Sequence, residues 1–275
     1  MKPDHIQSMD WRILDSSASP LTGEALLPFV IDELECRRIG KGAAPLIHIW
    51  RHQQAFIVGL RDRKLTNARP AMEALIKQGY AVAVRNSGGA AVPLDKGVLN
   101  ISMIRPNPLG ITKLHDDFAA MAGLIQETIY RLAGAAHVEV TVGEIEGAYC
   151  PGAFDLALGG RKFCGIAQRR QTGAHIVQAF IVTEGVGAAR ARVAADFYSQ
   201  AAGNTDTGYP IVNEQTMTSV QEVVGAASVE HFVREFKNVI YGDRVRQQLS
   251  PAYDGYNQDE VMELIAQMGS RYNAE

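Results

Sequence analysis

One short segment, residues 149–170, holds the side chains best suited to covalent chemistry, and it reads YCPGAFDLALGGRKFCGIAQRR. The thiolate is the nucleophilic form of cysteine, and a free thiol titrates near pH ~8.5, so a nearby cation would raise the reactive fraction of Cys150 at neutral pH. Lys162 could supply that cation. Its ammonium, or the backbone N–H groups of nearby glycine turns, could also donate hydrogen bonds to an acyl oxygen. The residues alone leave a second interpretation open, in which Lys162 is a solvated strand residue and Cys150 an ordinary loop thiol.

A β-hairpin is expected to position this pair, because Gly159 and Gly160 separate two runs of alternating apolar residues and suit a two-residue primed turn. The turn fixes four cross-strand pairs: Leu158 with Arg161, Ala157 with Lys162, Leu156 with Phe163, and Asp155 with Cys164. One face of the hairpin is then apolar, and the other carries Asp155, Lys162 and Cys164. Cys164 is a rival nucleophile, although a strand position beside Phe163 fits packing better.

A second glycine turn, Arg85-Asn86-Ser87-Gly88-Gly89, follows the alternating stretch YAVAV. Glycines let a ligand approach the main chain closely, and successive N–H groups can form a cradle for an oxygen. Two adjacent glycines between strands are also typical of an ordinary turn or bulge, so the pattern leaves both interpretations open. The sequence also leaves the role of Arg85 open: it could end a strand in solvent, bind an anion or pair with Asp95.

The rest of the chain predicts short strands followed by helices. We expect strands at residues 11–14, 46–50, 55–60, 80–85, 98–104, 138–142 and 175–183. The strands at 46–50 and 55–60 are close enough for an antiparallel pair, and a turn at Asp95-Lys96-Gly97 predicts a hairpin between a strand near Ala91 and the strand at 98–104. Helices are expected at residues 27–38, 70–78, 112–132 with Thr112 as N-cap, 188–201, 217–224, 229–241 and 259–272.

The composition is that of an ordinary globular protein: 275 residues, 47% hydrophobic and 21% charged. A net charge of -3 provides no basic field for a phosphate backbone, so we expect no nucleic-acid partner. The N-terminus has no apolar signal region and no stretch is long enough to span a bilayer, so we expect no membrane partner and a cytoplasmic location. Three irregularly spaced cysteines fit reduced thiols, and no histidine or cysteine pair has zinc-like spacing, so no metal is predicted.

Together, the two glycine segments resemble the biotin/lipoate protein ligase superfamily. RNSGGAAVPLDKGVLNISM resembles its R-R-x-(S/T)-G-G-G-x-V-x-H-D-x-G-x-x-N-x-S block, and DLALGGRKFCGIAQRR resembles the block in which a lysine precedes G-x-(A/S)-Q. EIEGAYCPGAFDLAL is similar to the amidotransferase branch, whose catalytic cysteine lies in a Tyr-Cys-Pro-Gly loop. The likeness runs from about Trp11 to Gln200. It departs from the common pattern at Asn86, Ala90 and Leu94, and the loss of the histidine and a glycine argues against adenylate chemistry.

The resemblance implies an α+β fold with a mixed, largely antiparallel sheet flanked by helices. Residues 11–205 would form the catalytic domain and residues 206–275 a helical extension packed on it. The motif matches make Cys150 the nucleophile and Lys162 the active-site lysine. Substrate or acyl binding falls to a larger set of matching residues: Arg85, Asn86, Ser87, Gly88, Gly89, Asp95, Gly97, Asn100, Asp155 and Gly165.

The implied reaction moves an octanoyl or lipoyl group from a lysine of the glycine cleavage H protein to lysines of lipoyl domains in the E2 subunits of 2-oxoacid dehydrogenases. Cys150 would hold the acyl group as a thioester, and no cofactor is expected. Three alternatives stay open: an octanoyltransferase that uses acyl carrier protein as donor, an ATP-dependent lipoate ligase, and a lipoyl-domain-binding module without turnover.

Overall fold

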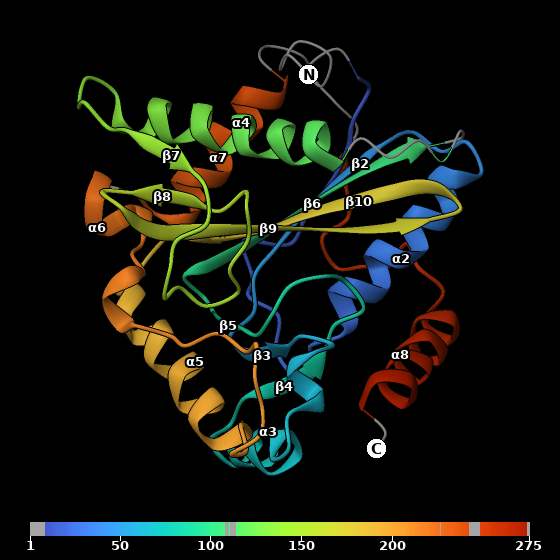
Figure 1. Cartoon of the computed structure of the whole chain (residues 1–275). Coiled ribbons are helices and arrows are strands. Elements are labelled where there is room, and N and C mark those ends of the chain that lie inside the picture. The colour runs from blue at the N-terminus through green and yellow to red at the C-terminus, as the bar shows by residue number, and fades with distance from the viewer. Residues whose placement is uncertain (1–8, 108–109, 111–113, 226, 242–247, 274–275) are drawn as a thin grey trace.

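Two β-sheets of unequal size form the centre of the computed structural model, which describes residues 9–107, 110, 114–225, 227–241 and 248–273 (Figure 1). The large sheet has the order β11-β1-β2-β6-β10-β9-β8-β7, and the small sheet has the order β4-β3-β5. The strands of the large sheet are β1 Arg12–Asp15, β2 Leu46–Trp50, β6 Val98–Asn107, β7 Val140–Val142, β8 Leu156–Leu158, β9 Arg161–Gln171, β10 Gly173–Val182 and β11 Gln248–Leu249. Those of the small sheet are β3 Gln54–Val58, β4 Ala81–Val84 and β5 Val92–Asp95.

Antiparallel pairing runs without interruption from β2 to β7, whereas β1 pairs in parallel with β2 and β11. In the small sheet β3 is parallel to β4 and antiparallel to β5. The expected mixed, largely antiparallel sheet with flanking helices is therefore confirmed.

The helices cover both faces of the large sheet (Figure 1). Their bounds are α2 Leu27–Gly40, α3 Ala68–Lys77, α4 Leu114–Ala133, α5 Gly187–Ala201, α6 Val220–Val224, α7 Val229–Tyr241 and α8 Gln258–Asn273, with short 3-10 turns η1 Asp62–Lys64 and η2 Glu214–Thr216. Helices α4 and α7 pack on one face, and α2 and the small sheet lie on the other, with α3 and α5 beyond the small sheet. Within the described ranges, no helix combines the length and apolar character needed to cross a bilayer.

The alternating side chains of the central strands supply these two layers. On β6, Leu99, Ile101 and Met103 face the α4 layer, so the neighbouring positions Asn100 and Ser102 face α2 and the small sheet. A polar residue in a buried strand needs a partner or a ligand. The α2 side of the sheet is therefore where the sequence places its functional side chains.

The Gly159-Gly160 hairpin forms, but only half of its predicted register is correct. Ala157 pairs with Lys162 and Leu158 with Arg161, as expected, and both glycines have positive φ. A bulge between Leu156 and Ala157 then shifts the register, so that Leu156 pairs with Cys164. The predicted pairs Leu156–Phe163 and Asp155–Cys164 are wrong, because a bulge inserts one residue on one strand and leaves it unpaired.

Two other predicted pairings are wrong for a common reason. The strands near 46–50 and 55–60 belong to different sheets, since β2 pairs with β1 and β6 while β3 pairs with β4 and β5. The strands on either side of the Asp95-Lys96-Gly97 turn also separate, β5 into the small sheet and β6 into the large one. Both short connections carry the chain between layers instead of folding it back on itself.

The C-terminal helices pack against the main body. Helix α7 contacts α4, and α8 contacts α2 and β4. The separation of residues 11–205 from 206–275 stays a prediction. The expected N-cap, Thr112, lies outside the described residues.

Candidate active site

Cys150 lies in the loop between β7 and β8 in a left-handed main-chain conformation, with φ of +49°. Few residues other than glycine adopt this conformation, and it persists only where the surroundings hold it. Lys162 Nζ, on β9, donates hydrogen bonds to the carbonyl oxygens of Tyr149 at 2.9 Å and Cys150 at 2.5 Å. The lysine therefore holds the main chain that presents the thiol.

Lys162 is fully buried and forms an ion pair with Asp155, whose carboxylate oxygen lies 2.8 Å from Nζ. Burial raises the pKa of Asp155 to about 6, against the opposing effect of the Lys162 charge and of a hydrogen bond from the Gly152 N–H. The sequence placed these two residues on the hairpin face opposite the apolar one and left open whether that face was an active site or solvated surface. They form a buried pair because the loop bearing Cys150 and the bridge from Lys162 to Met217 cover that side of the hairpin.

Arg85, not Lys162, is the cation that contacts the thiol. Its Nη2 lies 3.2 Å from Cys150 Sγ and donates a second hydrogen bond to the Ala90 carbonyl at 2.5 Å. Gly89, with φ of +97°, permits this approach, since a Cβ there would lie 2.3 Å from the guanidinium and 3.0 Å from Sγ. Of the three roles that the sequence left open for Arg85, a strand end in solvent and a pair with Asp95 are wrong, because the guanidinium is buried against the Cys150 side chain and Asp95 pairs with Arg190.

The turn that follows Arg85 is anchored from two elements that the sequence gave no reason to connect. Arg169 on β9 donates to the Asn86 carbonyl at 2.8 Å and pairs with Glu33 of α2 at 2.8 Å. The Asn86 amide also approaches Met268 of α8, with 3.6 Å between Nδ2 and Sδ. Ser87 is buried and its hydroxyl has no partner among the described residues.

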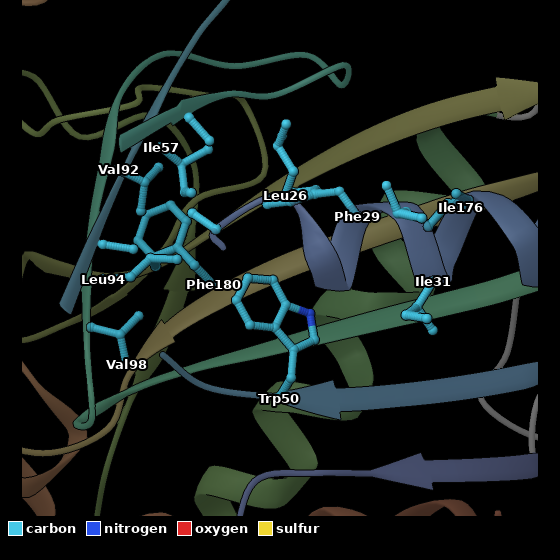
Figure 2. Packing of buried hydrophobic residues seen from close by; sticks show 14 of the residues in the cluster. Leu26, Phe29, Ile31, Trp50, Ile57, Val92, Leu94, Val98, Ile176 and Phe180 are labelled. Atoms are coloured by element: carbon cyan, nitrogen blue, oxygen red, sulfur yellow. The ribbon is translucent and has the colours of Figure 1, made fainter. Parts of the chain in front are cut away.

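A small apolar cavity of about 40 Å³ lies beside Cys150, between the large sheet and the small one. Trp50, Asn100, Phe180 and Gly165 are successive cross-strand neighbours on β2, β6, β10 and β9, so they form one row across its floor. Three strand spacings of ~4.8 Å make this row about 14 Å long, at least the length of an extended eight-carbon chain, but the free volume is small, so the side chains over the row must move apart to admit such a chain. Figure 2 shows the side chains of Ile57, Val92 and Leu94 around the Phe180 ring, where they close the opposite wall.

Gly165 is required on this floor, because a Cβ there would lie 2.5 Å from the Phe180 ring. Asn100 also lines the cavity, and its amide nitrogen has no partner in the described part of the chain. Arg85, Asn100 and Gly165 are thus the predicted binding residues that touch the cavity itself.

The next row of the floor is polar. Ser102 and Gln178 line the cavity, and both donate to the carboxylate of Asp32 on α2, at 2.5 and 2.8 Å. His48, in the same row, completes the set at 2.7 Å from Asp32 and also contacts the Tyr253 hydroxyl at 2.9 Å. Sequence reasoning missed this network, since its members come from four separate elements and carry no shared motif.

Asp95 and Gly97 lie outside the cavity lining. Asp95 accepts two hydrogen bonds from Arg190 of α5, at 2.7 and 2.9 Å, so the Arg85–Asp95 pair considered above does not form. Gly97 leaves room for the same guanidinium, because a Cβ would lie 2.7 Å from Arg190 Nη2. Asp95 and Gly97 therefore stabilise the turn between β5 and β6, and neither residue lines the cavity.

Two wider grooves meet over the glycine turn. One, of about 650 Å³, is lined by Asn86, Ser87, Gly88 and Gly89 together with Arg61, Arg169 and Arg170. The other, of about 530 Å³, lies between the first turns of α4 and residues 152–154. Both include Gly88, Gly89 and Pro151, the neighbours of the thiol. We call the joined pair the outer groove.

The remaining cysteines are packed in the interior. Burial raises the pKa of the Cys164 thiol well above its ordinary value and that of Cys36 to about 12. Cys164 belongs to the apolar cluster beneath α4, with Phe163 and Leu156. A thiol that stays protonated in an apolar cluster is a poor nucleophile. No cluster of metal-binding side chains occurs in the described ranges.

A mixed sheet with an apolar cavity beside a glycine turn, and a lysine on the neighbouring hairpin, places the chain in the lipoate ligase fold class. The chain belongs to the family of the lipoyl protein ligase A/B catalytic domain, which matches residues 24–241. The fold resembles that of lipoate-protein ligase A bound with ATP, with a TM-score of 0.68 at 18% identity over 97% of both chains. A putative lipoate protein ligase from T. acidophilum gives 0.66 at 19% identity over 97% of this chain and 98% of its own.

Closer relatives are transferases by name. The octanoyl-[GcvH]:protein N-octanoyltransferase of Anoxybacillus flavithermus is 37% identical over 82% of this chain and 80% of its own length. The lipoyl-[GcvH]:protein N-lipoyltransferase of Listeria monocytogenes is 35% identical over 78% of this chain and 77% of its own.

Proposed function

We propose that this protein transfers an octanoyl or lipoyl group from the lysine of the glycine cleavage H protein to lysines of lipoyl domains, through a thioester on Cys150. The observation that carries the proposal is the position of Cys150 Sγ: it lines the mouth of the apolar cavity and contacts the guanidinium of Arg85 at 3.2 Å. The names of the relatives that cover most of the chain support the same donor.

Each residue of the site has a distinct task in this reaction. The Arg85 guanidinium favours the thiolate of Cys150, because a charge-assisted hydrogen bond stabilises the ionised form. The row from Gly165 to Trp50 binds the acyl chain, and Lys162 with Asp155 holds the Cys150 main chain in its left-handed conformation. Pre-formed geometry of this kind lowers the barrier by placing the reacting groups before the reaction begins.

The reaction has two steps: acylation of Cys150 by the donor amide, and transfer of the acyl group from Cys150 to the acceptor lysine. The thiolate attacks the carbonyl carbon of the donor amide, the C–S bond forms, and the C–N bond breaks as the lysine nitrogen leaves with a proton. An acceptor lysine then attacks the thioester and reverses these changes. A thioester lies above an amide in free energy, so the intermediate is sparsely populated, but one amide replaces another and the overall reaction is close to balanced. It therefore needs no ATP.

The alternative functions make different demands on the site. An octanoyltransferase that uses acyl carrier protein would load Cys150 from a thioester donor. An ATP-dependent ligase would activate free lipoate without the thiol, yet Leu94, where many superfamily members have histidine, is buried in the wall of the cavity. A pure binding module would not need a left-handed cysteine held by a buried ion pair.

An exchange experiment tests the proposal. Octanoylated H protein is mixed with isotopically labelled, unmodified H protein or lipoyl domain, without ATP, and octanoyl transfer to the labelled protein is followed by intact mass. We expect transfer with the wild-type protein and none with Cys150→Ala. Transfer that requires ATP and free acid, or that survives Cys150→Ala, would refute it.

A further inference from the structure

The glycine turn beside the thiol contains a run of unused hydrogen-bond donors. The backbone N–H groups of Asn86, Ser87, Gly88, Gly89 and Ala90 have no partner among the described residues. The run is bounded by paired groups, because Arg85 N donates to Val58 O at 3.1 Å and Ala91 N to the Tyr198 hydroxyl at 3.1 Å. Gly88 and Gly89 are exposed on the floor of the outer groove, so their N–H groups are accessible. Consecutive free N–H groups are a common way to bind an anionic oxygen.

This turn is also the main chain that lies against the reacting atom. A Cβ on Gly89 would lie 3.0 Å from Cys150 Sγ, so the Gly89 main chain is already in contact distance of the thiol. At Gly88, by contrast, a Cβ would meet nothing within 4 Å. A carbonyl carbon bonded to Sγ would hold its oxygen within reach of this turn.

Two charged groups near the thiol are already engaged, whereas Arg85 Nε, the Ser87 hydroxyl and the Asn100 amide nitrogen have no partner among the described residues. An ammonium has three hydrogens, and Lys162 Nζ has three acceptors: Tyr149 O, Cys150 O and Asp155 Oδ2. The Nη2 of Arg85 has two hydrogens and two acceptors, Ala90 O and Cys150 Sγ. Lys162 could serve an acyl oxygen only by giving up a bond that holds the Cys150 main chain.

We propose that the N–H groups of Gly88 and Gly89 form the oxyanion hole of this site and that Lys162 is a positioning residue. The proposal rests on the acyl-transfer function proposed above. When the Sγ electron pair forms the C–S bond, the carbonyl π pair moves onto oxygen, and the two N–H groups donate to that oxygen. The C=O bond then re-forms, the C–N pair leaves with the lysine nitrogen, and the proton lost by the thiol is returned to that nitrogen through solvent. Pre-oriented donors stabilise this charge without reorganisation, and removing one lowers kcat about 100–1000-fold.

A matched pair at one position tests the idea. Gly88→Pro removes the N–H, whereas Gly88→Ala keeps it and adds the methyl group for which the structure leaves room. Acylation of Cys150 is followed by the burst of p-nitrophenol from p-nitrophenyl octanoate, which needs neither protein partner. Alkylation of Cys150 by iodoacetamide is followed in parallel, because that displacement forms no oxyanion. We expect the acylation rate of the proline variant to be about 100-fold below that of the alanine variant, with alkylation rates within about threefold of each other.

The outcomes are distinguishable. Equal acylation by the two variants refutes the oxyanion hole, and so does an equal fall in acylation and alkylation, which would mean that the turn only positions the thiol. If the proline variant does not fold, glycolic acid is placed at position 88 by nonsense suppression; this ester removes the N–H without a side chain, and an acylation rate equal to that of glycine refutes the proposal. Failure of the wild-type protein to acylate Cys150 at all would instead refute the proposed function.

Discussion

Replacing Lys162 by methionine should destabilise the protein strongly, because it leaves the Asp155 carboxylate alone in the interior. The two side chains are 0% and 1% exposed and 2.8 Å apart. Removing one partner of a buried ion pair costs about 3–5 kcal/mol, since the remaining charge has lost its compensation. For a chain of this size that loss lowers the melting temperature by roughly 6–20 °C. Lys77→Met, an exposed lysine on α3, is the matched control and should stay within ~0.5 kcal/mol of wild type.

The loss of unfolding free energy caused by Lys162→Met should be larger above pH 6 than near pH 5. The folded-state pKa of Asp155 is about 6, above the unfolded value of ~3.9, so the folded state binds this proton more tightly. The stability contributed by that proton is complete below pH ~4 and is lost as the pH rises through about 6. Above pH 6 the ionised carboxylate depends on Lys162, so Lys162→Met should cost most there and less near pH 5, where Asp155 of the variant is neutral.

A double variant separates stability from activity. Lys162→Met combined with Asp155→Asn removes both charges and keeps an acceptor for the Gly152 N–H. It should recover at least ~2 kcal/mol relative to Lys162→Met alone, measured by urea unfolding at pH 7.5, yet remain inactive because the Cys150 main chain has lost its donors. The buried-pair reasoning would be refuted if the losses of unfolding free energy in Lys162→Met and Asp155→Asn simply added in the double variant. It would also be refuted if Lys162→Met alone cost under ~1 kcal/mol.

Three further predictions concern the thiols and the cavity. Arg85→Gln should slow iodoacetamide alkylation of Cys150 at pH 7 by about 10–100-fold, the value of one charge-assisted hydrogen bond, whereas Arg192→Gln, an exposed arginine paired with Glu214, should not; equal rates for both would contradict the Arg85 contact. Ala167→Phe should fill part of the acyl cavity and exclude about two methylenes, which lowers octanoyl transfer about 15-fold relative to butyryl transfer in an ester-cleavage assay; an unchanged chain-length profile would place the chain elsewhere. Cys164→Ala should keep the transfer activity and lose about 1 kcal/mol in thermal unfolding, and loss of activity in a folded variant would restore Cys164 as a candidate nucleophile.

Local patterns in the sequence were sufficient to predict most elements and the hairpin turn. Gly159 and Gly160 both adopt the positive φ that a primed turn requires, and Ala157 faces Lys162 as the turn dictates. The predicted register failed at the next residue, Leu156, because of a bulge for which the alternation of apolar residues carries no signal.

Long-range pairing was harder to predict, because it depends on which layer each strand joins. Short connections favour hairpins, but the links from β2 to β3 and from β5 to β6 pass between the two sheets. The apolar cavity lies between these sheets, so the errors in strand pairing concealed the structure that builds it.

The candidate site was predicted in its parts but not in its connections. The motifs identified Cys150, Lys162 and Arg85, yet residue spacing assigned the thiol contact to the lysine when the arginine makes it. Only the loop conformation at Cys150 and the left-handed Gly89 decide which cation reaches Sγ, and neither angle can be read from residue types. The link from Arg169 to Glu33 is likewise a tertiary contact between distant segments.

The most direct test of the central claim is to capture the acyl group on the enzyme. The protein is incubated with the octanoyl thioester of a small thiol, since exchange between two thioesters is nearly balanced and lets the intermediate accumulate. The acylated enzyme is freed of donor, its modified peptide is located by mass spectrometry, and unmodified lipoyl domain is then added. We expect one octanoyl group on Cys150, discharged onto the lipoyl-domain lysine, and no adduct with Cys150→Ala. An adduct elsewhere, or one that the lipoyl domain does not discharge, would contradict that claim.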